Sequence, residues 1–255
     1  MGKATQRFSL KGKLALVTGS SRGLGRAIAL GLAEHGARLA LVSRGKDSLK
    51  EVAGESAGEA RIFGADLAET GSVQGLFERV RDACGVPDIL VNCAGTTYRG
   101  PAIEQPLAEW RRVLAVNLDA PLVLSQCFAR ELIAAGRGGK ILNICSLLSG
   151  RARPTVPAYT ASKTGLLGLT RALAVEWMEH GINVNAIGPG YFDTELTAPV
   201  KNQPEFDAWV TGRAPVGRWG EPRDLVGAAV FLCAPASDFV TGQLLYVDGG
   251  WTAAL

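Results

Sequence analysis

Two side chains with complementary acid–base chemistry stand four positions apart in the chain, Tyr159 and Lys163. On a helix this spacing places both side chains on one face, one turn apart. A free tyrosine holds its proton up to about pH 10, and a neighbouring ammonium group favours the phenolate. The pair is therefore a candidate proton donor and acceptor, although an ordinary helix surface can carry the same spacing.

The chain around this pair alternates short apolar runs with longer amphipathic stretches. The apolar runs are typical of strands buried on both faces, and the amphipathic stretches are typical of helices. Strands are expected at residues 13–18, 37–43, 60–65, 88–92, 140–146, 182–187 and 244–247. Helices are expected near residues 26–35, 47–55, 70–84, 106–135, 157–180 and 222–233. Thr70 is a candidate N-cap for the third of these helices.

This alternation predicts an α/β protein, a single-domain Rossmann fold over residues 1–255 with a doubly wound, seven-stranded parallel sheet. Ligands bind at the carboxyl ends of the strands in such sheets. Ser146 and Asn92 stand at strand ends of this kind. Residues 190–220 interrupt the alternation with prolines and tryptophans, and we expect them to form a lid over a small-molecule substrate.

Composition excludes several other classes of protein. The net charge is +3 and the basic residues are scattered, which indicates neither a nucleic-acid surface nor a membrane patch. Five cysteines without a CxxC motif and two histidines indicate neither a disulfide framework nor a metal site. The first 13 residues lack the apolar run of a signal peptide, and no apolar stretch reaches 18 residues. We therefore expect a cytoplasmic protein.

A glycine-rich turn joins the first expected strand to the helix after it. Its spacing is GxxxGxG, which differs from the GxGxxG of the general dinucleotide fingerprint. Glycines at such a turn let the backbone approach a pyrophosphate, which then faces the positive end of the helix. The candidate cofactor-binding residues of the turn are Gly19, Ser21, Arg22, Gly23, Leu24 and Gly25.

The end of the second strand indicates which dinucleotide would bind. A free ribose 2′-hydroxyl is usually held there by Asp or Glu. This chain instead has Ser43 and Arg44, with no carboxylate before Asp47. Arg44 and Arg22 could both bind a 2′-phosphate, because a guanidinium matches its geometry. We predict NADP(H) as the preferred cofactor, with NAD(H) also allowed; the alternative is that both arginines are simply solvated.

The next two strand ends carry further candidates. Asp66 and Leu67 follow the third strand, where the carboxylate could bond the adenine amino group. Asn92, Ala94 and Gly95 follow the fourth strand and would let the backbone pass close to the cofactor. Asp, Asn and Gly also favour turns, so an ordinary turn remains the alternative for both segments.

Together these residues resemble the short-chain dehydrogenase/reductase family. The matching motifs stand in the family's order from about residue 10 to residue 250, namely Thr18-Gly19-x-x-x-Gly23-x-Gly25, Asn92-x-Ala94-Gly95, Asn117, Ser146, Tyr159-x-x-x-Lys163 and Pro189-Gly190. The resemblance implies an NAD(P)-dependent oxidoreductase acting on CH–OH groups, which transfers a hydride between a nicotinamide and a secondary alcohol or ketone.

The resemblance also implies a role for each motif residue. Tyr159 is the general acid or base, and Lys163 supports it and binds the nicotinamide ribose. Ser146 polarises the substrate carbonyl, and Asn117 holds a water that links the lysine to solvent. The nicotinamide is bracketed by the segment after the sixth strand, whose candidates are Pro189, Gly190, Phe192 and Thr194.

Within the family, residues 144–149, 188–197, 213–220 and 227–232 resemble the sugar-acid members, the gluconate 5-dehydrogenases above all. An acid substrate would suit arginines in the expected roof of the pocket, since a guanidinium binds a carboxylate well. The roof carries Arg99, Arg151, Arg153 and Arg213, each of which could equally be a solvated rim charge.

Two other functions compete with this one. A 3-oxoacyl-thioester (acyl carrier protein) reductase would keep the chemistry and change the substrate. A non-catalytic NADP-binding regulator would keep the fold, but damage to the catalytic Ser, Tyr or Lys is its expected mark, and all three are present. The resemblance further implies a homotetramer, or a homodimer, formed through residues 106–135 and 157–180.

Overall fold

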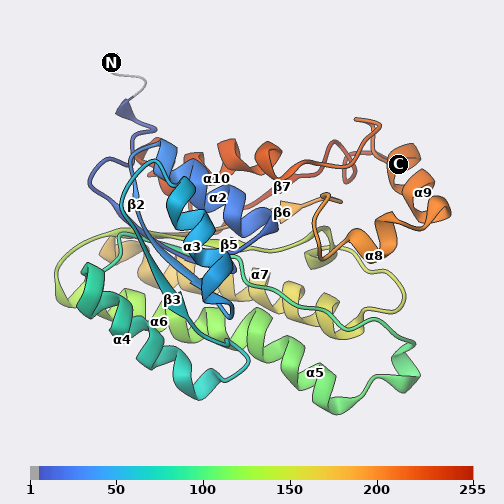
Figure 1. Ribbon diagram of the computed structural model, residues 1–255, viewed down its shortest axis with the longest axis horizontal. Coiled ribbons are helices and arrows are strands. Elements are labelled where there is room, and N and C mark those ends of the chain that lie inside the picture. Colours follow the sequence, from blue (N-terminus) through green and yellow to red (C-terminus); the bar gives the residue numbers. More distant parts are fainter. Residues whose placement is uncertain (1–5, 255) are drawn as a thin grey trace.

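The computed structural model describes residues 6–254, and its centre is one parallel sheet of seven strands (Figure 1). The strands are β1 (Leu14–Thr18), β2 (Arg38–Ser43), β3 (Ala60–Gly64), β4 (Ile89–Asn92), β5 (Gly139–Ile144), β6 (Ile182–Pro189) and β7 (Leu244–Val247). The predicted α/β class and the seven-stranded, doubly wound parallel sheet are confirmed. Residues 1–5 and 255, which the predicted domain includes, lie outside the described part.

The order of the strands creates a crevice at the middle of the sheet. Across the sheet the order is β3-β2-β1-β4-β5-β6-β7, so the chain moves away from β1 in one direction and returns to its other side with β4. The connections after these two strands leave the sheet on opposite faces, which opens a crevice at their carboxyl ends. Every residue of β1 and β4 is buried, as their apolar sequences require.

Two layers of helices cover the sheet (Figure 1). One face is covered by α2 (Gly23–Glu34), α3 (Lys46–Glu55) and α10 (Val226–Cys233). The other face is covered by α4 (Val73–Cys84), α6 (Ala120–Ala134) and α7 (Pro157–Trp177), with α5 (Leu107–Leu114) beside α7. Each layer buries its own apolar cluster against the sheet, so the strand ends and the site they carry are fixed from both sides.

The long helix expected over residues 106–135 is interrupted. A π-helical turn, Ala115–Asp119, separates α5 from α6, and buried Asn117 lies at its centre. α5 packs against α7, whereas α6 packs against α4 and the sheet. The apolar periodicity continues through the turn, so the sequence pattern alone predicts one helix.

Two other helix predictions are wrong in detail. Thr70 is not an N-cap, because it begins a 3-10 turn, Thr70–Ser72, and α4 starts only after that turn. The Ser72 hydroxyl donates to the carbonyl of Glu69 at 2.8 Å and closes the turn. The helix expected at 222–233 likewise begins with a 3-10 turn, Pro222–Leu225, before α10.

The expected lid region contains two short helices, α8 (Ala198–Lys201) and α9 (Pro204–Arg213), which Figure 1 shows at one end of the molecule. Aromatic side chains pack between α9, the end of β6 and the C-terminal turn, where the ring of Tyr191 lies 4.9–5.8 Å from four others, namely Phe206, Trp209, Trp219 and Trp251. Among the described helices none combines the length and the apolar character needed to cross a membrane.

Candidate active site

Tyr159 and Lys163 lie on the first turns of α7, next to the carboxyl end of β5. Lys163 is only 3% exposed, and its Nζ donates to the carbonyl of Ile144 at 2.6 Å. The same Nζ lies 5.8 Å from the centre of the Tyr159 ring. The helical spacing thus brings the phenol and the ammonium group together at a strand end.

Ser146 is held beside this pair by a capping box. Its Oγ accepts from the amide of Leu148 at 3.1 Å, and its own amide donates to Ser149 Oγ at 3.2 Å. Ser149 Oγ in turn donates to the carbonyl of Lys163 at 2.9 Å, which ties the strand end to α7. Because Ser146 Oγ already accepts one hydrogen bond, its hydrogen is left to donate to a ligand.

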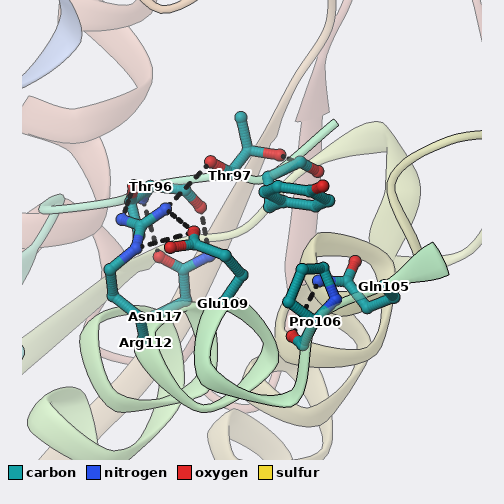
Figure 2. A network of polar contacts seen from close by, with 8 residues as sticks. Thr96, Thr97, Gln105, Pro106, Glu109, Arg112 and Asn117 are labelled. Carbon is teal, nitrogen blue, oxygen red and sulfur yellow. Dashed lines mark hydrogen bonds and ion pairs between the residues drawn. The ribbon is translucent and has the colours of Figure 1, made fainter. Parts of the chain in front are cut away.

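Asn117 reaches the site from the π-helical turn and is completely buried. Its Oδ1 accepts from the amide of Thr96 and its Nδ2 donates to the carbonyl of the same residue, both at 2.9 Å (Figure 2). Nδ2 also donates to Ser162 Oγ at 3.0 Å, and that hydroxyl donates to the carbonyl of Tyr159 at 2.8 Å. The side chain therefore joins the loop after β4 to α7, while its role in holding a water stays a prediction.

Two glycines of the turn between β1 and α2, Gly19 and Gly25, have no room for a side chain. Gly19 has φ +67, and a Cβ on it would lie 2.7 Å from the Cα of Ala94 in the loop after β4. A Cβ on Gly25 would lie 2.2 Å from the carbonyl oxygen of Gly19. The Thr18 hydroxyl accepts from the amides of Cys93 and Ala94, at 3.0 and 3.1 Å, and locks the two loops together. This cradle at a helix N-terminus fits a pyrophosphate.

A long groove runs from the glycine-rich turn to Tyr159. It is lined by all the predicted cofactor-binding residues except Asn92, namely Gly19, Ser21, Arg22, Gly23, Leu24, Gly25, Ser43, Arg44, Asp66, Leu67, Ala94, Gly95, Tyr159, Lys163, Pro189, Gly190, Phe192 and Thr194. Asn92 is buried in the sheet instead, where its Nδ2 donates to Asn143 Oδ1 at 2.9 Å.

Several groove residues were not expected from the sequence, among them Ser48, Arg112 and Val116. Arg112 occupies none of the family's motif positions. The signal that could have singled it out is its spacing from Glu109, since i and i+3 are neighbours on a helix.

The end of the groove beside β2 is positively charged. Arg22 and Arg44 both line it and are exposed, and neither forms an ion pair within the described part of the chain. Asp47, the first carboxylate after the strand, pairs with Lys50 at 2.7 Å and is not among the groove's lining residues. Two guanidinium groups without an ion-pair partner in the described part of the chain suit a phosphate better than a ribose hydroxyl.

A second, smaller cavity meets the groove at Ser146 and Tyr159, which line both. Its other lining residues are Thr97, Arg99, Leu147, Leu148, Arg153, Val156, Pro189, Gly190, Tyr191, Leu196 and Thr197. Among these described residues there is no Asp or Glu. Arg151 and Arg213 do not line the cavity, and Arg213 stacks on the ring of Trp251 instead.

The two arginines of this cavity come from separate loops. Arg153 packs its guanidinium 4.9 Å from the centre of the Phe206 ring and donates from Nη1 to the Tyr191 hydroxyl at 3.4 Å. Desolvation, and then the charge of Arg153, lower the pKa of Arg99. The cavity therefore holds two like charges that an anion would stabilise.

Cysteine and metal chemistry are not indicated by the described residues. Cys93 and Cys145 line the groove, but burial raises the pKa of the Cys93 thiol to about 12 and raises that of Cys145 as well. Neutral thiols are poor nucleophiles. Nowhere in residues 6–254 do three His, Cys, Asp or Glu side chains gather as a metal site would require.

Comparison with known proteins agrees with this geometry. A protein-family model described as enoyl-(acyl carrier protein) reductase matches residues 19–252. The chain is 43% identical over 252 residues to the gluconate 5-dehydrogenase of Gluconobacter oxydans, covering 97% of this chain and 98% of that protein. It is 42% identical over 248 residues to the 2-dehydro-3-deoxy-D-gluconate 5-dehydrogenase of Escherichia coli, covering 96% and 98%.

A solved structure extends this similarity to the fold. The crystal structure of a gluconate 5-dehydrogenase from Burkholderia cenocepacia, in complex with NADP and tartrate, has a TM-score of 0.92 and 40% identity to this chain. The match covers 99% of this chain and 100% of that one. With nearly the whole chain matched in sequence and in structure, the protein belongs to the short-chain dehydrogenase/reductase family of NAD(P)-dependent oxidoreductases.

Proposed function

We propose that this protein is an NADP(H)-preferring oxidoreductase that interconverts a sugar acid and its keto form, as gluconate 5-dehydrogenases do. The observation that carries the proposal is the cavity beside Ser146 and Tyr159, where Arg99 and Arg153 lie without a carboxylate among the described lining residues. A substrate carboxylate would relieve the repulsion between the two guanidinium groups, and guanidinium–carboxylate pairs are among the strongest hydrogen-bonded pairs in proteins.

In this proposal the catalytic side chains handle the oxygen of the reacting carbon. The bound cofactor supplies or accepts the hydride. In the reductive direction the carbonyl oxygen gains negative charge, which Ser146 stabilises with its free hydroxyl hydrogen and Tyr159 neutralises with its proton. This leaves a phenolate, and the Nζ of Lys163 lies 5.8 Å from the centre of its ring. In the oxidative direction the same phenolate removes the alcohol proton.

The proteins that this chain resembles support a sugar acid. Two of them are named for gluconate and for 2-dehydro-3-deoxy-D-gluconate, and a third was crystallised with NADP and tartrate, itself a hydroxylated acid. The 3-oxoacyl-thioester reductase remains the second candidate, and the description of the matching family model favours it. The paired arginines favour the sugar acid, because a thioester carries no carboxylate at the reacting end.

Substrate choice is tested by NADPH oxidation with 5-ketogluconate and with acetoacetyl thioesters. We expect 5-ketogluconate to be reduced with the higher kcat/KM. Arg153→Gln should raise its KM about tenfold or more, because a charge-assisted hydrogen bond is lost. Arg151→Gln, the same change on an arginine outside the cavity, should leave KM within about twofold. Faster reduction of the thioester would reject the sugar-acid proposal.

Cofactor preference follows from the charged end of the groove. The wild-type protein should show a higher kcat/KM with NADP than with NAD. Arg44→Asp should lower the value for NADP about a hundredfold, because it replaces a phosphate-binding cation by an anion, and should favour NAD instead. Arg26→Asp is a matched control in α2 outside the groove lining. A wild-type preference for NAD would contradict the prediction.

The two α7 residues should separate chemistry from cofactor binding. Tyr159→Phe should lower kcat by about 10²–10⁴ through loss of the general acid, with little change in the Kd for NADPH. Lys163→Met should lower kcat and also raise that Kd about tenfold, because the lysine is expected to bind the nicotinamide ribose. Fluorescence titration with NADPH gives Kd independently of turnover, and Tyr98→Phe is the matched control. Near-normal turnover by Tyr159→Phe would exclude the mechanism.

We further propose a cytoplasmic enzyme that assembles as a homotetramer, or as a homodimer, through α5, α6 and α7. Exposed apolar side chains on these helices support such contacts, including Val175, which is 84% exposed, Leu107 and Ile133. Sedimentation velocity should give a species of about two or four times the 26.8 kDa chain mass. A single monomeric boundary at micromolar concentration would refute the assembly.

A further inference from the structure

The segment Thr96-Thr97 forms the partition between the cofactor groove and the substrate cavity. Thr96 lines the groove, whereas Thr97 lines the cavity. The segment follows β4 and leads directly to Arg99, one of the two cavity arginines. The position of this segment therefore sets the width of the cavity and the position of the Arg99 backbone.

Two side chains from the α5 region hold this partition (Figure 2). Within the partition, Asn117 contacts Thr96 but not Thr97, through the two backbone hydrogen bonds already described. Arg112 binds both residues, since its Nη1 donates to Thr96 Oγ1 at 2.7 Å and its Nη2 donates to the carbonyl of Thr97 at 3.3 Å. Arg112 is thus the contact that fixes the substrate side of the partition.

Glu109 fixes the guanidinium group of Arg112 in turn. Its Oε2 accepts from Nε at 2.9 Å and from Nη2 at 2.6 Å, one turn away on α5 (Figure 2). The arginine and glutamate side chains are 39% and 33% exposed, so the pair is less screened than an open surface pair. Glu109 also stands in the first turn of α5, where the helix dipole favours a carboxylate.

We propose that Arg112, oriented by Glu109, is a positioning residue for substrate binding. It does not line the substrate cavity, so it acts on the substrate through Thr97 and, beyond it, Arg99. The far end of the same loop is held separately, because the amide of Gly100 donates to the carbonyl of Thr155 at 2.9 Å. Losing Arg112 frees one end of the cavity wall while Tyr159, Lys163 and the glycine-rich turn keep their own contacts.

The kinetic test compares Arg112→Gln with Arg111→Gln, the same change on the neighbouring exposed arginine, which lines neither cavity. This test uses 5-ketogluconate as the substrate, so it rests on the proposed function. Arg112→Gln should raise the KM for 5-ketogluconate about tenfold while kcat and the Kd for NADPH stay within about threefold. Thr96→Val removes the Oγ1 acceptor of Arg112 while keeping the shape of the side chain, and it should also raise KM.

The effects of Arg112→Gln and Thr96→Val on KM should not be additive, because both substitutions break the hydrogen bond between Arg112 Nη1 and Thr96 Oγ1. Arg112→Gln in a Thr96→Val background should therefore raise KM by a smaller factor than it does in the wild type. A tenfold rise in the Kd for NADPH with an unchanged substrate KM would overturn the inference and make Arg112 a cofactor ligand.

Hydrogen exchange gives a readout that needs no substrate. The two hydrogen-bonded amides of this loop, those of Thr96 and Gly100, should exchange faster in Arg112→Gln and in Thr96→Val than in the wild type, and Arg111→Gln should leave them unchanged. If the wild-type protein fails to reduce 5-ketogluconate, the proposed function is lost while the exchange data still test the positioning role. Unchanged exchange in both variants would overturn the inference.

Discussion

A buried positive charge is the constraint on which the catalytic end of the sheet depends. Lys163 is almost inaccessible, and an unpaired ammonium group in such a place is costly. Its partner is the carbonyl of Ile144, the last residue of β5, so the strand must end there and leave that oxygen available. The chain leaves the sheet directly after Ile144, and the capping box of Ser146 and Ser149 connects this segment to α7 through the carbonyl of Lys163. Strand end, serine, tyrosine and lysine are thereby fixed relative to one another.

The residues of the site differ in how firmly they are held. Lys163 and Asn117 each form a hydrogen bond to another element. Ser146 is tied to α7 through Ser149. The carbonyl of Tyr159 accepts from Ser162, which also binds Asn117. The cavity arginines lie on connecting loops, and Phe206 of α9 packs against one of them, Arg153. Reaction chemistry tolerates little displacement, whereas substrate choice can change with loop sequence. This division explains how one family serves many substrates.

Much of this arrangement could be predicted from the sequence, because it depends on local patterns. Seven apolar runs predicted the strands, and the residues after them predicted which side chains would meet at the crevice. The exception among these residues, Asn92, bonds to Asn143 on the neighbouring strand, a contact 51 residues away in sequence. Arg112 was missed for the same reason, since its partners Thr96 and Thr97 lie on a different element. The interruption at Asn117 leaves the apolar periodicity intact, so no pattern reveals it.

The π-helical turn also constrains the length of the chain. Such a turn holds one residue more than an α-helix would use over the same path. Removing a residue from Ala115–Asp119 would close this turn to an ordinary α-helical one, so α5 and α6 would keep their partners but the widened backbone around Asn117 would be lost. The spacing between Arg112 and Asn117 should therefore be preserved when this chain diverges. Single-residue insertions and deletions should instead fall beyond the end of α6, in the exposed segment at Gly136 and Arg137.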